Sequence, residues 1–215
     1  LDRDAAREIL RNTLIGADDG ELFLERCRSE VLSFDDGRLR TSSFDASEGF
    51  GLRAVQGETV GYAHSTEVSE QAMRRATGTV RLAIGADGGS LAAAPQATNH
   101  KLYSDHNPLT DSTFPAKIDI LREIDAYARS LDRRVVQVSA TIAASHQEVV
   151  ILRVDGPDVS DSRPMVRMNV SIIVEQDGQR QTGYVGGGGR YGLNGMLEPT
   201  HWQPLVREAL RIAVV

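Results

Sequence analysis

Large and small side chains alternate along residues 48–65, EGFGLRAVQGETVGYAHS, and this alternation restricts the fold of the whole chain. A period of two separates the two faces of a β-strand. We therefore predict a β-hairpin with residues 56–58 in its loop, which places Leu52 opposite Tyr62 on a bulky face. The other face is then bare, with glycine and other small residues opposite one another. Because glycine weakens a strand unless something approaches its backbone, either a helix of the same protein, which is the simpler explanation, or an extended ligand should cover that face.

The first half of the chain has the signals of a helix, four strands and a second helix. Asp2 is a suitable N-cap for the first helix, which Gly16 ends, and Ser69 caps the second, which Gly85 ends. The strands that we predict between these helices cover residues 21–34, residues 38–43 and the two arms of the hairpin.

The second half repeats this order. A helix begins at Pro115, and a last helix begins near Pro204. The pair Asp177-Gly178 is typical of a tight turn between two strands. The four strands that we predict here cover residues 134–144, 147–154, 165–175 and 179–185.

This order of elements predicts an α+β fold with two antiparallel sheets, each flanked by helices. Helix, four strands, helix occurs twice, which indicates an internal duplication. We expect a first α+β unit at residues 1–85, a connector at residues 86–114 and a second α+β unit at residues 115–215, cut at its last helix. The connector is rich in glycine, proline and small residues and has neither a helical nor a strand period.

The composition is that of an ordinary soluble domain. The 215 residues are 40% hydrophobic and 25% charged, with a net charge of −6. Acidic and basic residues are intermixed, so we expect neither a nucleic acid nor a membrane as partner. The single cysteine, Cys27, excludes a disulfide framework within the chain and favours the cytoplasm. The chain begins without methionine and stops within an apolar helical pattern, so we expect both ends to be truncation points.

Four consecutive glycines, Gly186, Gly187, Gly188 and Gly189, precede Arg190. They do not match a phosphate-binding loop, because that motif needs Lys-Ser/Thr directly after the glycines or a helix that opens at the loop. A turn at residues 177–178 places Gly183 opposite Ile172 and Gly187 opposite Met168 in the predicted hairpin. The glycines then leave room above a bulky face, and something must fill it.

No catalytic or metal-binding residue follows from the spacing of the five histidines. No two of them lie four residues apart with a glutamate between them, as the helical zinc-protease motif requires. We interpret His146 as a solvated loop residue. His100 and His106 lie in the connector, where a flexible loop is the simpler explanation than a metal site.

The segments FGLRAVQGETVGYAHS and TGYVGGGGRYG, one in each half, resemble the TldD/PmbA family, long called modulators of DNA gyrase and now regarded as metalloproteases. The resemblance is to the TldD side and to the amino-terminal part of the family. It implies a cytoplasmic zinc-dependent peptidase of about twice this length. The family's zinc site is an HExxxH helix and a distant cysteine, which lie beyond the region covered here.

The resemblance therefore implies no cofactor in this chain, zinc in the missing carboxy-terminal domain, and no peptidase activity of the chain by itself. It also implies a dimer, either a homodimer or a heterodimer with a PmbA-type partner, that encloses a cavity where unfolded peptides are cut. We expect this chain to handle the substrate and to dimerise, with the loop from Gly186 to Arg190 as the substrate-binding candidate. An alternative is a non-catalytic protein-binding module, acting on gyrase or a toxin-antitoxin pair, without a protease domain.

Overall fold

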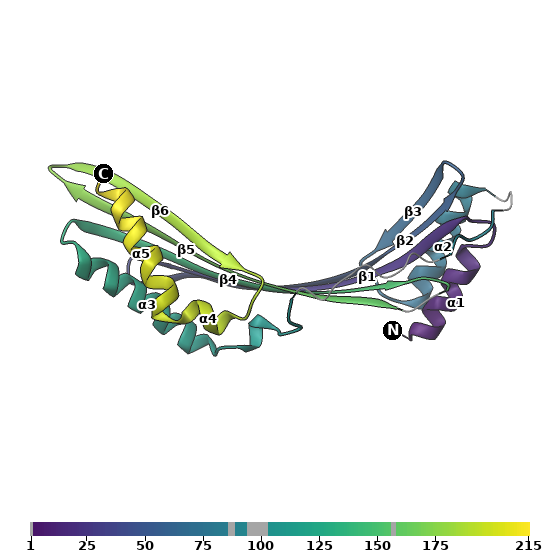
Figure 1. Ribbon diagram of the computed structural model, residues 1–215, viewed down its shortest axis with the longest axis horizontal. Coiled ribbons are helices and arrows are strands. Elements are labelled where there is room, and N and C mark those ends of the chain that lie inside the picture. The colour runs from purple at the N-terminus through teal and green to yellow at the C-terminus, as the bar shows by residue number, and fades with distance from the viewer. Residues whose placement is uncertain (1, 86–88, 94–102, 156–157) are drawn as a thin grey trace. The chain divides into compact units, whose positions relative to one another are not determined.

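The computed structural model of the protein describes residues 2–85, 89–93, 103–155 and 158–215 (Figure 1). The described part of the chain contains five α-helices, one 3-10 helix and six strands. In chain order they are α1 (Arg3–Thr13), β1 (Asp19–Asp35), β2 (Arg38–Gln56), β3 (Thr59–Ser65), α2 (Glu70–Ile84), η1 (Pro108–Thr110), α3 (Phe114–Leu131), β4 (Val135–Leu152), β5 (Val159–Gln176), β6 (Gln179–Gly189), α4 (Leu193–Leu197) and α5 (Pro199–Ala213).

The six strands form one antiparallel sheet in the order β3-β2-β1-β4-β5-β6. The predicted α+β class is confirmed, but the two separate sheets are not found. Each half contributes three strands rather than four. The predicted strand 38–43 and the first arm of the predicted hairpin both lie in β2, and most of the predicted strands 134–144 and 147–154 lies in β4. In β2 the polar stretch between the two predicted pieces is exposed, and an exposed strand needs no apolar alternation to continue. The internal duplication stays a prediction.

Two compact units share these strands. Unit 1 consists of Leu1–Cys27, Ala46–Leu102 and Gln147–Asp161, and unit 2 of Arg28–Asp45, Tyr103–His146 and Ser162–Val215. The expected connector overlaps residues 86–88 and 94–102, which with His100 lie outside the described residues. The division of the sequence at residues 85 and 115 stays a prediction.

Unit 1 has its core between α1, α2 and the strands (Figure 1). Both predicted helix caps are confirmed: Asp2 accepts a hydrogen bond from the Asp4 amide at 2.9 Å, and Ser69 from the Ala72 amide at 3.1 Å. An N-cap oxygen satisfies an amide that has no partner inside the helix. The apolar stripes of the two helices then pack against each other and α2 packs on β3.

The predicted register of the β2–β3 hairpin is wrong by one residue. Gln56 pairs with Thr59, so the turn holds two residues, and Tyr62 lies opposite Arg53 instead of Leu52. A shift of one residue exchanges the two faces of a strand. Gly61 therefore lies on the same face as Leu52, where a Cβ atom on it would be 2.6 Å from the Val80 carbonyl oxygen of α2. A helix does approach a glycine of this hairpin, but on the face that carries the large residues of β2.

Unit 2 has its core between the sheet and helices α3, α4 and α5 (Figure 1). The predicted register of the β5–β6 hairpin is confirmed, with Ile172 opposite Gly183 and Met168 opposite Gly187. The last helix begins at Pro199, five residues earlier than predicted, and Pro204 lies inside it. None of the described helices is long and apolar enough to cross a membrane.

Candidate functional site

The glycines Gly186 to Gly189 lie in strand β6 and not in a loop, and Arg190 follows the strand directly. Strand β6 is the last strand of the sheet, with β5 as its single neighbour. One edge of β6 therefore carries backbone groups that no other strand of the described chain uses. An edge of this kind can pair with an additional strand.

The register shows which backbone groups point to this open edge. Gln176 pairs with Gln179 across a two-residue turn, whose residues Asp177 and Gly178 have φ values of 52° and 75°. The pair that closes such a turn exchanges both of its backbone hydrogen bonds, and hydrogen-bonded pairs then alternate with non-hydrogen-bonded pairs. Gly187 is thus bonded to β5, whereas Gly186 and Gly188 present their amide and carbonyl groups to the open edge. The complete outward set in β6 is Arg180, Thr182, Tyr184, Gly186 and Gly188.

Helix α5 fills the space above two glycines of β6. A Cβ atom on Gly183 would overlap the carbonyl oxygen of Ala209 and lie 2.7 Å from the amide nitrogen of Ala213. A Cβ atom on Gly187 would lie 3.3 Å from a methyl carbon of Leu205. On this face, the room predicted above the glycines is filled by the protein itself.

Side chains of β5 fill part of the opposite face. The Oδ1 atom of Asn169 lies where a side chain on Gly186 would begin. This oxygen accepts hydrogen bonds from the Tyr184 hydroxyl at 2.9 Å and from Arg167 Nε at 3.0 Å. The Asn169 amide is thereby held over Gly186 beside the open edge. Tyr184 extends toward β5 but remains 56% exposed, so much of its ring is accessible to a ligand.

Gly188 is required by packing against the backbone of β5, whereas the neighbour of Gly189 is the side chain of Tyr191, which is 38% exposed. A Cβ atom on Gly188 would overlap the Val166 carbonyl oxygen and lie 2.9 Å from the Cα atom of Arg167, and one on Gly189 would overlap the ring of Tyr191. Backbone atoms cannot give way as a flexible side chain can. Replacement of Gly188 by valine should therefore lower the stability of unit 2, which excludes such a variant as a clean test of substrate binding.

Arg190 is held by an aromatic ring. Its guanidinium carbon lies 5.0 Å from the ring centroid of Tyr103, a cation–π arrangement. None of the described carboxylates forms an ion pair with Arg190. The charge is thus positioned beside the end of β6 and is available to a carboxylate of a ligand.

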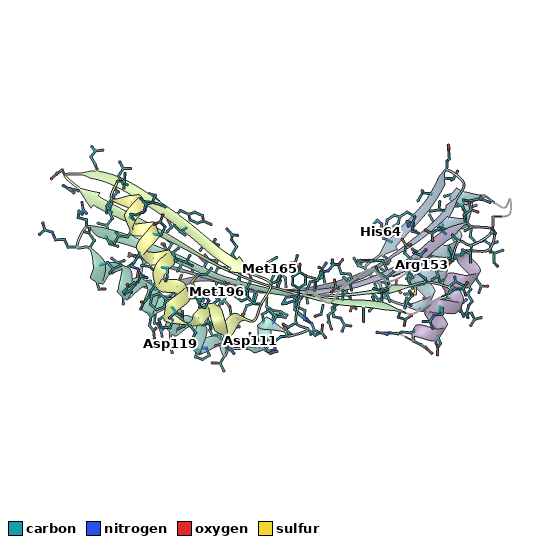
Figure 2. The ribbon with its side chains drawn as sticks, in the orientation of Figure 1. His64, Asp111, Asp119, Arg153, Met165 and Met196 are labelled. Carbon is teal, nitrogen blue, oxygen red and sulfur yellow. The ribbon has the colours of Figure 1, made fainter. Side chains whose placement is uncertain are left out.

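A buried carboxylate fixes the segment that follows the glycines. The Asp111 side chain, labelled in Figure 2, is 1% exposed and accepts hydrogen bonds from the Leu193 amide at 2.5 Å and from the His106 ring. Leu193 is the first residue of α4, where an amide lacks a partner within the helix. The chain after Arg190 is therefore anchored to the segment before α3. Sequence analysis missed this contact because Asp111 and Leu193 are distant in sequence.

The described residues offer no metal site. No three His, Cys, Asp or Glu side chains among them lie close enough to hold a metal ion. The interpretation of His146 as a solvated loop residue is wrong: it lies in β4, is 6% exposed and its Nε2 atom is 2.8 Å from the Ser162 hydroxyl. The described residues therefore do not fit a zinc ion.

The chain belongs to the PmbA/TldD metallopeptidase family. The family's central-domain profile, described as "PmbA/TldA metallopeptidase central domain", matches residues 107–215, and that of "PmbA/TldA metallopeptidase domain 1" matches residues 20–83. The sequence is 34% identical to a metalloprotease TldD homologue of Haemophilus influenzae over 84% of this chain and 38% of that protein. It is 31% identical to a homologue of Buchnera aphidicola subsp. Acyrthosiphon pisum over 92% of this chain and 42% of that protein. The chain thus spans about two fifths of these relatives.

Solved structures show the same fold at low sequence identity. A putative modulator of DNA gyrase from Bacteroides thetaiotaomicron superposes with a TM-score of 0.72 at 14% identity, over 99% of this chain and 49% of that one. TldE from Thermococcus kodakarensis superposes with a TM-score of 0.71 at 13% identity, over 97% of this chain and 46% of that one. The likeness extends through both units of the chain.

Proposed function

We propose that this chain is the amino-terminal substrate-handling portion of a TldD/PmbA-type zinc metalloprotease that degrades unfolded peptides. In this proposal an extended peptide adds to the open edge of β6, and the zinc chemistry belongs to a carboxy-terminal domain outside this chain. Strand addition recognises the main chain, so it suits a protease that accepts unfolded segments of varied sequence.

The single observation that carries the proposal is the position of Gly186 and Gly188 on the open edge. Their outward amides and carbonyls lie on a stretch without side chains, so a peptide strand can approach without a steric conflict. Tyr184 flanks this stretch with an exposed ring, and Arg190 adds a positive charge at its end. The charge suits a carboxylate, either of an acidic side chain or of a peptide terminus.

Dimerisation is part of the same proposal. The protease would work as a homodimer or as a heterodimer with a PmbA-type partner, and the dimer would enclose the cavity in which the peptide is cut. The support for dimerisation is the family membership of the chain. Analytical ultracentrifugation of the full-length protein, alone and with a PmbA-type partner from the same genome, tests this part.

A proline at Thr182 tests peptide binding at β6. The Thr182 amide points to the open edge, so Thr182→Pro removes an outward donor and leaves the β5–β6 hydrogen bonds intact. In the full-length enzyme we expect KM for an unfolded peptide to rise about threefold to tenfold, the equivalent of one hydrogen bond, with kcat little changed. Thr182→Val, which keeps the amide, is the matched control. Equal KM values for the two variants at equal melting temperature would contradict the proposal.

The alternative function is a binding module that acts without a protease domain, on gyrase or on a toxin-antitoxin pair. One solved structure with this fold carries the name of a putative modulator of DNA gyrase. Sequencing the gene beyond the codon for Val215 separates the two functions. An HExxxH segment in frame supports the protease, and its absence from the complete reading frame supports the binding module.

A further inference from the structure

A second open edge, at β3 in unit 1, lacks the features that normally prevent strand pairing. Strand β3 is the other end of the sheet and has the sequence TVGYAHS, with neither a charged residue nor a proline. Proteins usually protect exposed edges with lysine, proline or bulges. Val60 and Tyr62 are 56% and 58% exposed. An edge that is unprotected and exposed in this way is suited to an added strand.

The register again identifies the free backbone groups. Gln56 and Thr59 close the two-residue turn, so the pairs of Ala54 with Gly61 and of Leu52 with Ala63 are hydrogen-bonded. Val60, Tyr62 and His64 therefore present their amides and carbonyls outward. These three residues also share the face opposite α2, so a side chain of an added strand that points to this face would lie beside their exposed side chains.

A pocket lies beside these residues on the same face. Its volume is about 310 Å³, and its lining includes Phe23, Glu25, Gly49, Gly51, Tyr62 and His64. We call it the β3 pocket. The rings of Tyr62 and His64 are 5.8 Å apart and tilted by 31°, and His64 is labelled in Figure 2. The Tyr62 hydroxyl lies 2.8 Å from the Cβ position of Gly51, so the glycine allows this ring to lie along the pocket wall.

The charge of the β3 pocket is negative. The described residues that line it include the carboxylates of Glu25 and Glu48 and no lysine or arginine. Arg26 neutralises Glu48 through a contact of 3.1 Å. Glu25 has no ion-pair or hydrogen-bond partner among the described residues. A ligand side chain that combined a positive charge with a flat surface for stacking would match both the carboxylate and the rings, and arginine is the residue that has both.

We propose that the β3 edge and the β3 pocket bind an extended polypeptide segment whose arginine side chain stacks on Tyr62 and pairs with Glu25. The segment adds to β3 through the outward groups of Val60, Tyr62 and His64. A second copy of this chain fits less well, because it would bring its own uncompensated Glu25 to the same edge. The site lies wholly in unit 1 and is independent of the β6 edge proposed above, which lies in unit 2.

Three capped peptides test the proposal: acetyl-Ser-Thr-Val-Arg-Val-Thr-Ser-amide and the same peptide with citrulline or glutamate in place of arginine. Binding to the 215-residue chain is measured by isothermal titration calorimetry. Citrulline keeps the flat shape of arginine without its charge. We expect the arginine peptide to bind about tenfold more tightly than the glutamate peptide, with citrulline between them.

Two pairs of variants locate the binding. Glu25→Gln should weaken the arginine peptide about fivefold and leave the citrulline peptide unchanged, whereas Glu58→Gln, the same charge change at the exposed turn, should alter neither. Val60→Pro removes an outward amide and should weaken all three peptides alike, whereas Val60→Thr keeps the amide and should not.

Equal affinity for the three peptides, or a Glu25→Gln variant that binds like Glu58→Gln, overturns the proposal. Sedimentation velocity measures whether the chain forms a dimer through the β3 edge. If the chain dimerises, Val60→Pro abolishes the dimer and the peptides do not displace it, then the edge belongs to a second copy and the arginine site is wrong.

Discussion

A Cβ atom on Gly183 would overlap the carbonyl oxygen of Ala209, so β6 and α5 touch through their backbones. The same relationship joins Gly61 of β3 to Val80 of α2. In both strands the glycine is followed by an exposed tyrosine on the opposite face, Tyr184 or Tyr62. Each open edge of the sheet is thus held by a helix on one face while its other face stays accessible.

This contact makes Gly183 sensitive to a single added methyl group. Gly183→Ala should lower the free energy of unfolding by about 1–3 kcal/mol, because α5 must move away from the sheet. The control is Gly78→Ala in α2, where a Cβ atom meets nothing within 4 Å. It should raise stability by about 0.5–1 kcal/mol through helix propensity. Urea unfolding measures both, and a Gly183→Ala variant as stable as the parent would exclude the backbone contact.

Lys117 is a buried lysine held in an ion pair within unit 2. Its side chain is 2% exposed and pairs with Glu30, whose side chain is 19% exposed. Lys117→Met should cost about 3 kcal/mol, the low end for a broken buried pair, because water still reaches Glu30. Arg122→Met on the same helix breaks an exposed pair with Asp119 and should cost less than about 1 kcal/mol. Equal losses in thermal unfolding of the two variants would show that burial is not the cause.

Asp35 should make unit 2 sensitive to acid. Hydrogen bonds from Ser139 and Gln137, at 2.6 and 2.8 Å, together with the Arg40 charge, hold the pKa of its carboxyl below the usual value. A lowered folded-state pKa contributes stability that is complete above the unfolded-state pKa of about 4 and is lost as the pH falls through the folded value. Asp35→Asn should therefore be less stable than the parent at pH 7, and the difference should shrink below about pH 4. A difference that stays constant from pH 7 to pH 2.5 in chemical unfolding would contradict this assignment.

The turn between β5 and β6 depends on a residue that tolerates positive φ. Asp177 has a φ of 52°, a conformation that β-branched residues adopt at a cost. Asp177→Val should lower the free energy of unfolding by about 1–2 kcal/mol, and Asp177→Asn should leave it nearly unchanged. Differential scanning calorimetry of the two variants tests this, and an equally stable valine variant would exclude strain at the turn.

Turn chemistry explains which parts of the fold could be predicted from the sequence. Asp177-Gly178 defines a two-residue turn, so the register of β5 and β6 followed correctly. Gly57 offers no such definition, because residues 56–58 are compatible with loops of two or three residues, and the register of β2 and β3 was therefore wrong. The division of β2 failed because polar residues on an exposed strand resemble a loop in sequence. The division of β4 failed because Ser145 and His146 interrupt the apolar pattern, although His146 is buried.

The candidate site could be predicted only in part. The glycine run was conspicuous in the sequence, but its position at the end of the sheet depends on the strand order, which local patterns do not determine. The contacts of Gly187 with Leu205 and of Gly186 with Asn169 depend on where α5 packs and on which face β5 presents. Glu25 and Glu48 likewise could not be predicted as residues of a binding pocket, because the sequence does not show which carboxylates the fold brings beside the aromatic rings.

The interleaving of the two units has a consequence for attempts to divide the protein. A fragment that ends at residue 102 lacks residues 147–161 and thus Leu152, which belongs to the core of unit 1. A fragment that starts at residue 103 lacks Leu32 and Phe34, which belong to the core of unit 2. Neither fragment can complete a core alone, so each should be insoluble when produced separately. Produced together in one cell, the two fragments should complement each other and copurify as a nicked but folded protein.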